Sequence, residues 1–199
     1  MEITFTDNTI TLDKELNALD DFVITFCKKL DKHKIKYVIV SGYVAIVFGR
    51  TRATEDVDII IERTPKEKFS ELWRDVLQDF ECVNNVDESS AYNDFLLNND
   101  SIRFSEPGRP MPNIEVKFQH NVLDKYTLEK ALELRLNQHA LFISPLEMQI
   151  AYKLHLGSEK DIEDATHLYT VFYKYLNKEH LSNCFVLLKV PHERVDLLG

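Results

Sequence analysis

The chain has 199 residues, of which 44% are hydrophobic and 29% charged, and its formal net charge at pH 7 is -9. This size and apolar content predict one globular domain, with or without a small helical annex. The acidic balance argues against broad nonspecific binding to nucleic acid. Its three cysteines form no Cys-x-x-Cys pair, which favours reduced thiols in a cytoplasmic protein. We expect neither a signal peptide nor a membrane-spanning segment.

The first third of the chain predicts a helix, then two strands separated by a short buried helix. Apolar residues recur at helical spacing over residues 13–33. Residues 36–40 are apolar and β-branched, as in a central strand, and residues 43–48 are too apolar for a surface loop. Residues 57–61 are apolar on both faces, which suits a strand of a sheet covered on both sides.

The middle of the chain predicts a helix followed by further strands. Residues 64–67 read Thr-Pro-Lys-Glu, a pattern typical of a helix start. Residues 92–104 predict two strands around a turn at 98–100. Residues 106–112, rich in proline, predict a loop, and residues 113–118 alternate polar and apolar as a half-buried strand does.

The last third of the chain predicts helices. The Ser-Pro-Leu-Glu at residues 144–147 repeats the pattern of a helix start, and Gly157 is a natural stop for that helix. The predicted fold is therefore α/β: a mixed sheet flanked by helices, followed by a helical C-terminal region. We expect the core over residues 1–122 and the helical region over residues 123–199.

Polar residues follow the first central strand and begin the second. Ser41 and Gly42 stand where a strand gives way to a helix, so free backbone N–H groups could meet phosphate oxygens there, and the missing Cβ of Gly42 would allow close approach. Asp56 and Asp58 are two residues apart in a strand and therefore share one face. Their charges repel, and a divalent cation between them would remove that cost. The pattern predicts a phosphate-and-metal site.

The stretch over residues 38–61 resembles the nucleotidyltransferase superfamily with the DNA-polymerase-β-like fold. More closely, it is similar to the nucleotidyltransferase toxins of abortive-infection systems, which carry a Gly-Gly turn, a small apolar helix, Gly-Arg-x-Arg-x-Thr and Asp-hydrophobic-Asp. The matching segments here are Ser41-Gly42, Gly49-Arg50-Thr51-Arg52-Ala53-Thr54 and Asp56-Val57-Asp58. The one departure from this pattern is Ser41, which replaces the first glycine.

The resemblance implies a metal-dependent enzyme that transfers NMP from an NTP to a hydroxyl acceptor, with two Mg²⁺ ions held by Asp56 and Asp58. The implied acceptor is RNA, such as a tRNA 3′ end, or a protein side chain, and a cognate antitoxin is an implied partner. Two alternatives stay open: a small-molecule nucleotidyltransferase of the kind that inactivates aminoglycosides, and a non-catalytic binding module on the same fold.

The resemblance also implies a third carboxylate on a later strand. Glu115, between Ile114 and Val116, is the best candidate for a metal ligand or for the group that deprotonates the acceptor. Asp94 and Asp100 compete with it, and Glu115 could also be only the exposed position of an alternating strand.

Arg50 and Arg52 precede the acidic strand. Either could meet the β- and γ-phosphates of the NTP through its forked guanidinium, or pair instead with nearby carboxylates. Thr54 completes the nucleotide-binding motif, although a local hydrogen bond is the simpler role for its hydroxyl.

In the related toxins the helical tail carries a lysine and a downstream aspartate that support the site. Lys153, together with Asp161 or Asp164, matches this arrangement. The alternative is purely structural: Lys153 would flank an amphipathic helix, and Asp161 would belong to a helix cap begun by Ser158.

Overall fold

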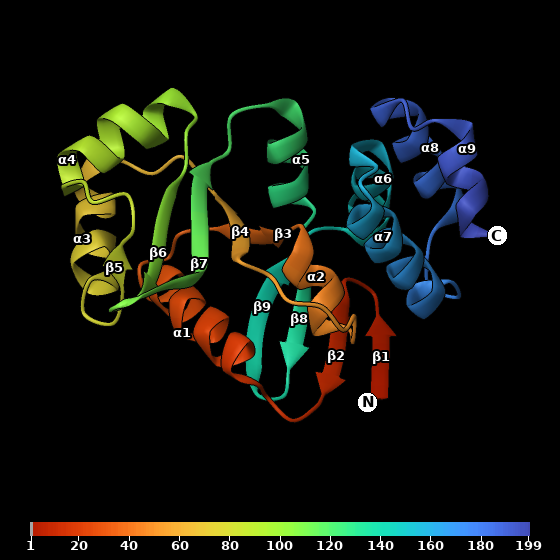
Figure 1. Ribbon diagram of the computed structural model, residues 1–199, viewed down its shortest axis with the longest axis horizontal. Helices are drawn as coiled ribbons and strands as arrows, with labels where there is room; N and C mark the ends of the chain where they lie inside the picture. Colours follow the sequence, from red (N-terminus) through yellow and green to blue (C-terminus); the bar gives the residue numbers. More distant parts are fainter. Residues whose placement is uncertain (1) are drawn as a thin grey trace.

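A computed structural model describes residues 2–199 (Figure 1). One mixed sheet contains nine described strands in the order β1-β2-β8-β9-β3-β4-β7-β6-β5. The strands are β1 (Glu2–Thr6), β2 (Thr9–Asp13), β3 (Tyr37–Val40), β4 (Asp56–Ile61), β5 (Glu81–Cys82), β6 (Ile102–Glu106), β7 (Arg109–Phe118), β8 (Leu132–Leu136) and β9 (His139–Ile143). The predicted class, a mixed α/β sheet with helices and a helical C-terminal region, is confirmed.

Helices lie between and after these strands. They are α1 (Ala18–Lys32), α2 (Gly42–Val47), α3 (Lys66–Val76), α4 (Glu88–Ser90), the π-helix η1 (Ala91–Phe95), the 3₁₀ helix η2 (Leu96–Asn98), α5 (Val122–Glu129), α6 (Leu146–Leu156), α7 (Glu159–Phe172), α8 (Lys178–Leu188), α9 (His192–Val195) and the 3₁₀ helix η3 (Asp196–Leu198). Helices α6 to α9 gather at one end of the molecule, and α3 and α4 lie at the other (Figure 1). None of the helices within residues 2–199 is both long and apolar enough to cross a membrane.

Strands β3, β4 and β7 form the centre of the sheet, where the sequence predicts strands. β4 runs antiparallel to β3 and parallel to β7. This register places Asp58 beside Val40 at the end of β3 and beside Glu115 on β7. Paired residues of neighbouring strands point to the same face, so the strand pairing alone brings the two carboxylates together.

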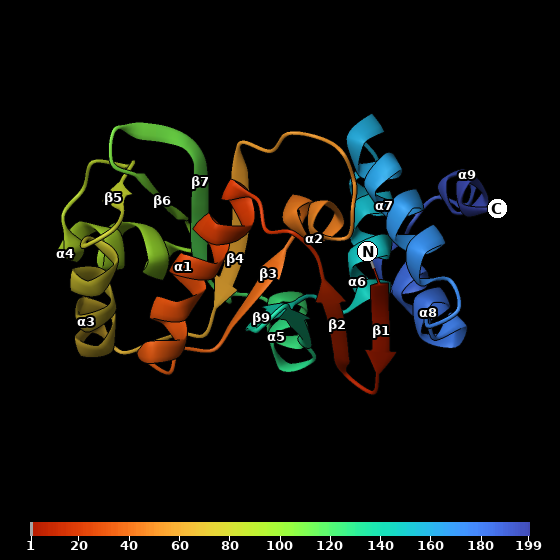
Figure 2. The ribbon, with the colours of Figure 1, turned by 90° about the horizontal axis from the view of Figure 1, so that it is seen from below.

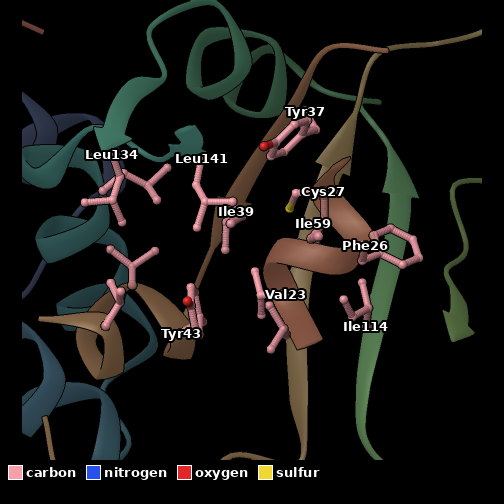
Figure 3. Packing of buried hydrophobic residues seen from close by; sticks show 14 of the residues in the cluster. Val23, Phe26, Cys27, Tyr37, Ile39, Tyr43, Ile59, Ile114, Leu134 and Leu141 are labelled. Carbon is pink, nitrogen blue, oxygen red and sulfur yellow. The ribbon is translucent and has the colours of Figure 1, made fainter. Parts of the chain in front are cut away.

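The opposite face of the central strands carries the hydrophobic core. Val57, Ile59 and Ile114 are buried there with Val23 and Phe26 of α1. Figure 3 shows this packing, with α1 crossing in front of the central strands. Alternate residues of β4 therefore serve two purposes, since one set anchors the strand and the other faces the candidate site.

An N-terminal hairpin was not predicted from the sequence. β1 and β2 are antiparallel and are joined by a tight turn with Asp7 at φ 52°. The expected helix over residues 13–33 begins instead at Ala18, because Asn17 caps it through a reciprocal capping box with Asp20. Leu12, included in the helical pattern, is a buried strand residue of β2.

The segment before β6 is helical, although the sequence predicts a strand there. The predicted strand from residue 92 is replaced by η1 and η2, which continue from α4, and only the second strand, β6, is present. Asp87 caps this helical segment, and Asn99 ends it in the left-handed conformation. The predicted loop over 106–112 is also mostly strand, because β7 already begins at Arg109 after a tight turn.

Two further strands lie in the segment that we expected to be helical from about residue 123. After α5, the strands β8 and β9 form an antiparallel hairpin that joins the sheet beside β2 and β3. Leu132, Leu134 and Leu136 point to one buried face, which is a strand pattern. The continuously helical part begins at Leu146, and the division of the chain at residue 122 stays a prediction.

Candidate functional site

Two carboxylates stand at the end of the sheet where β3 gives way to α2. Asp56 is exposed and Asp58 is partly buried, and both lie on the face of β4 away from the core. Within residues 2–199, neither of them forms an ion pair. Their negative charge therefore has no direct counter-charge from a lysine, arginine or histidine side chain.

The surroundings of Asp58 make its ionisation costly. Burial, and after it the neighbouring charges of Asp56 and Glu115, raise the pKa of Asp58 from its ordinary 3.8 to about 6. The Ser41 hydroxyl and the positive charge of Lys117 act to lower this pKa but do not cancel the increase. The site therefore carries excess negative charge that a bound cation would relieve.

The turn after β3 does not leave the Ser41 N–H and the space beside Gly42 open, as we expected from the sequence. Ser41 has φ 64° and ψ -135°, a conformation that glycine adopts more readily. Its N–H donates to Gln149 Oε1 at 3.2 Å, so this N–H is not free for phosphate as the sequence suggested. The space beside Gly42 is filled by the protein itself, because a Cβ there would lie 2.5 Å from Nη2 of Arg52.

A cavity of about 360 Å³ opens beside Ser41 and Asp58. Its walls come from the open face of the central strands and from the helices α5 and α6. The lining residues include Ile60, Lys117, Leu123, Asp124, Met148 and Tyr152. The cavity therefore combines apolar walls with a few charged groups, among them the carboxylates of Asp58 and Asp124, as small-molecule sites do.

Arg50 and Arg52 lie in the segment that links α2 to β4 and bends toward α7 (Figure 2). Arg52 donates from Nε and Nη2 to the two carboxylate oxygens of Asp164, at 2.9 and 2.8 Å. Arg50 pairs with Glu163 and lies 3.7 Å from Asp164. Their carboxylate partners belong to α7 and not to the acidic strand, and Asp164 raises the pKa of Arg52.

The lysine and aspartates of the helical region form one buried network with Arg52. Lys153 Nζ lies 2.7 Å from Oδ1 of Asp161 and 3.1 Å from Oδ2 of Asp164. Burial acts to raise the pKa of Asp161, but hydrogen bonds from Lys153 and Ser158 outweigh it and lower the pKa. Ser158 also caps α7, as the sequence predicts. Because Lys153 is only 2% exposed and does not line the cavity, its contact with the site runs through Asp164 and Arg52.

Glu115 is level with Asp58 but is already engaged. Arg103 of β6 binds it through Nε at 2.8 Å and Nη2 at 2.7 Å, and the Ser101 hydroxyl donates to it at 2.8 Å. The two competing candidates are both exposed: Asp94 lies in η1, and Asp100 lies just before β6.

Magnesium is the metal that the resemblance implies, and the donor chemistry fits it in part. Asp56 and Asp58 offer unpaired hard oxygen donors, whereas Glu115 would first have to leave Arg103. Within the described residues, no three histidine, cysteine or carboxylate side chains are grouped as a complete metal site. Magnesium is usually held by one or two carboxylates with water and substrate phosphates, so two free carboxylates suffice for this mode.

Thr54 and Gln149 show what sequence reasoning could and could not identify. Thr54 Oγ1 donates to the backbone oxygen of Asp56 at 2.8 Å, which is the local role considered for it. Gln149 was missed entirely, although it contacts the backbone of Ser41. The only available signal was Ser41 itself, a residue with a side chain at the position where the motif that this stretch resembles has glycine.

Comparisons with known proteins agree with this architecture. No family model matches the chain, and no curated protein matches its sequence. Among solved structures, an antigenic nucleotidyltransferase-like protein from Paracoccidioides brasiliensis is similar, with a TM-score of 0.55 and 18% sequence identity. The match covers 89% of this chain and 90% of that one. The chain therefore has the fold of this nucleotidyltransferase-like protein.

Proposed function

We propose that this protein is a magnesium-dependent nucleotidyltransferase that transfers NMP from an NTP to a hydroxyl acceptor. One observation carries the proposal. Asp58 lines a cavity with Ser41, has Asp56 two residues away on the same strand, and has a pKa raised to about 6 by burial and neighbouring carboxylates. An ionised Asp58 at the cavity wall, with Asp56 nearby and no ion pair to either carboxylate among the residues that the structure describes, is unfavourable, and binding of a cation and a polyphosphate would offset this cost.

The chain's own residues would divide the work as follows. Asp56 and Asp58 would hold Mg²⁺, which when bound polarises the α-phosphate and neutralises the leaving pyrophosphate. Arg52, whose guanidinium packs against Gly42, would attract the triphosphate through any donor not used by Asp164. The acceptor oxygen forms a bond to the α-phosphorus, the bond from that phosphorus to the bridging oxygen breaks, and pyrophosphate leaves.

The acceptor's proton needs a carboxylate. Glu115 remains the proposed base, beside Asp58 in the sheet register. Its ion pair with Arg103 would have to open first, because a carboxylate that accepts hydrogen bonds from a guanidinium is a weaker base. Arg103 is partly exposed, with 46% of its side chain accessible, so water can replace it at modest cost.

The acceptor and the partner are proposed only on the narrower resemblance to abortive-infection toxins. A tRNA 3′ end is the first acceptor to try, and a protein hydroxyl is the second. The net charge of -9 favours a short contact with RNA over an extended one. A cognate antitoxin remains a prediction.

Labelled nucleotides test the proposal directly. The protein is incubated with Mg²⁺ and each α-labelled NTP, with and without total tRNA, alongside Asp56→Ala and Asp58→Ala. We expect label on RNA or protein with the unaltered chain and none with either variant. Asp13→Ala is the matched control, because Asp13 is exposed on β2, across the sheet from the site. Unchanged turnover in both site variants, or no turnover and no calorimetric Mg²⁺ binding by the unaltered chain, would refute the proposal.

A further inference from the structure

The conformation of the turn at Ser41 requires support from elsewhere in the fold. A serine at φ 64° and ψ -135° is strained, because its Cβ meets the backbone in this region. Ser41 also connects β3 directly to α2, lines the same cavity as Asp58, and follows Val40, which is paired with Asp58 in the sheet. A relaxed turn would therefore move both the serine and the start of α2 relative to Asp58.

The side chain of Gln149 supplies this support. Its Nε2 donates to the backbone oxygen of Ser41 at 2.7 Å, and its Oε1 accepts from the backbone N–H of Ser41 at 3.2 Å. One amide thus binds both polar backbone groups of a single residue, which fixes the orientation of the peptide units on either side. The two residues are 108 positions apart in the sequence.

The amide itself is held in place. The Ser144 hydroxyl donates to Gln149 Oε1 at 2.8 Å, and Ser144 N–H donates to the backbone oxygen of Ile39 on β3. Gln149 is only 3% exposed and Ser144 only 1%, so water does not compete for these groups. We expected Ser144 to cap α6, but that helix has no side-chain cap and the hydroxyl serves Gln149 instead.

We propose that Gln149 is a positioning residue that holds Ser41 in its strained conformation and thereby sets the geometry of the carboxylate site. The expected effect on kcat rests on the proposed nucleotidyl transfer, whereas the expected effect on the conformation of Ser41 does not. Gln149 lines the same cavity as Ser41 and Asp58. Because its amide is hydrogen-bonded to the backbone of Ser41, we expect it to affect the substrate indirectly, through the position of Ser41.

The test combines Gln149→Ala with Ser41→Gly. We expect Gln149→Ala to lower kcat for NMP transfer by roughly tenfold or more, equivalent to about 1.4 kcal/mol in the barrier. Because glycine tolerates positive φ without support, adding Ser41→Gly should restore several-fold of the loss. A purely structural role in packing α6 predicts no such rescue. Ile150→Val, which loosens buried packing of the same helix, is the matched control and should not respond to Ser41→Gly.

Hydrogen exchange of the Ser41 amide provides a readout that does not depend on activity. Gln149 accepts the hydrogen bond from this amide, so Gln149→Ala should accelerate its exchange at least tenfold, whereas Ile150→Val should not do so selectively. Unchanged exchange, or full activity in Gln149→Ala, would overturn the inference. If the unaltered chain transfers no nucleotide, the proposed function fails, and the exchange measurement alone decides whether Gln149 holds the turn.

Discussion

Replacing Asp58 by asparagine should stabilise the fold while removing activity. Asparagine keeps the shape of the side chain but cannot ionise. The folded pKa of Asp58 is about 6 against an ordinary value of 3.8, a difference of about 2. At about 1.4 kcal/mol for each pKa unit, ionised Asp58 destabilises the folded state by up to about 3 kcal/mol.

The sign of the pH dependence follows from proton linkage. A carboxylate with a raised folded pKa binds protons more tightly in the folded than in the unfolded state, so this group's contribution to stability is lost as pH rises from about 4 to above 6. We therefore expect Asp58→Asn to match the unaltered chain near pH 4 and to exceed it by up to about 3 kcal/mol near pH 8.

Urea unfolding of both proteins at several pH values measures this difference. The remaining titrating groups are the same in both proteins, so their contributions largely cancel in the comparison. Asp13→Asn, at an exposed position, should change stability by no more than about 0.5 kcal/mol. A variant that is less stable than the unaltered chain near pH 8, or a difference that does not grow with pH, would refute the argument that Asp58 is held in an unfavourable charged state. Added Mg²⁺ should raise the Tm of the unaltered chain and not that of Asp58→Asn.

Three further substitutions address the surroundings of the site. Gly42→Ala places a methyl group against the Arg52 guanidinium, so we expect a loss of about 1–3 kcal/mol in thermal unfolding together with reduced turnover. Asp164→Asn leaves Arg52 without a carboxylate partner and Lys153 with Asp161 alone, so we expect a cost of about 3–5 kcal/mol, measured by urea unfolding. Arg103→Ala frees Glu115, and if this carboxylate can join the metal site, calorimetry should show roughly fivefold tighter Mg²⁺ binding.

Each of these substitutions has an outcome that contradicts its premise. Wild-type stability in Gly42→Ala would mean that Arg52 moves aside freely. A cost below about 1 kcal/mol for Asp164→Asn would mean that the buried network is not needed for folding, and Glu163→Gln, at a half-exposed partner of Arg50, supplies the comparison. Unchanged Mg²⁺ affinity in Arg103→Ala would leave Glu115 outside the metal site.

The sequence predicted the central strands and the short helix between them most accurately. The strands at 36–40, 57–61 and 113–118 and the helix at 43–48 are present, because their apolar runs have lengths and flanking residues typical of one structure. In the structure, the register of β4 with β7 places Asp58 beside Glu115. That register depends on the parallel pairing of β4 with β7, which the sequence did not specify.

Two of the missed elements are hairpins whose patterns can be seen in the sequence. Ile10 and Leu12 alternate with polar residues, as do Leu132, Leu134 and Leu136. In each hairpin the turn residue with positive φ is Asp7 or Asn137, and both types tolerate that conformation. We read the first pattern as part of a helix because leucines continued at helical spacing into α1. Alternation of polar and apolar residues over five positions indicates a strand, even where one of its leucines also fits the helical spacing of the next segment.

The contacts that shape the site could not be read from local sequence, because they join residues more than 100 positions apart. Gln149 of α6 holds Ser41, and Asp164 of α7 holds Arg52, at separations of 108 and 112 residues. Gln149 and Asp164 both belong to helices that contain no proposed metal ligand. The helical region is thus part of the site's construction: without α6 the turn loses its hydrogen bonds, and without α7 the arginine beside Gly42 loses its carboxylate. Any activity at Asp56 and Asp58 should therefore depend on how α6 and α7 pack against the turn at Ser41 and the segment that carries Arg52.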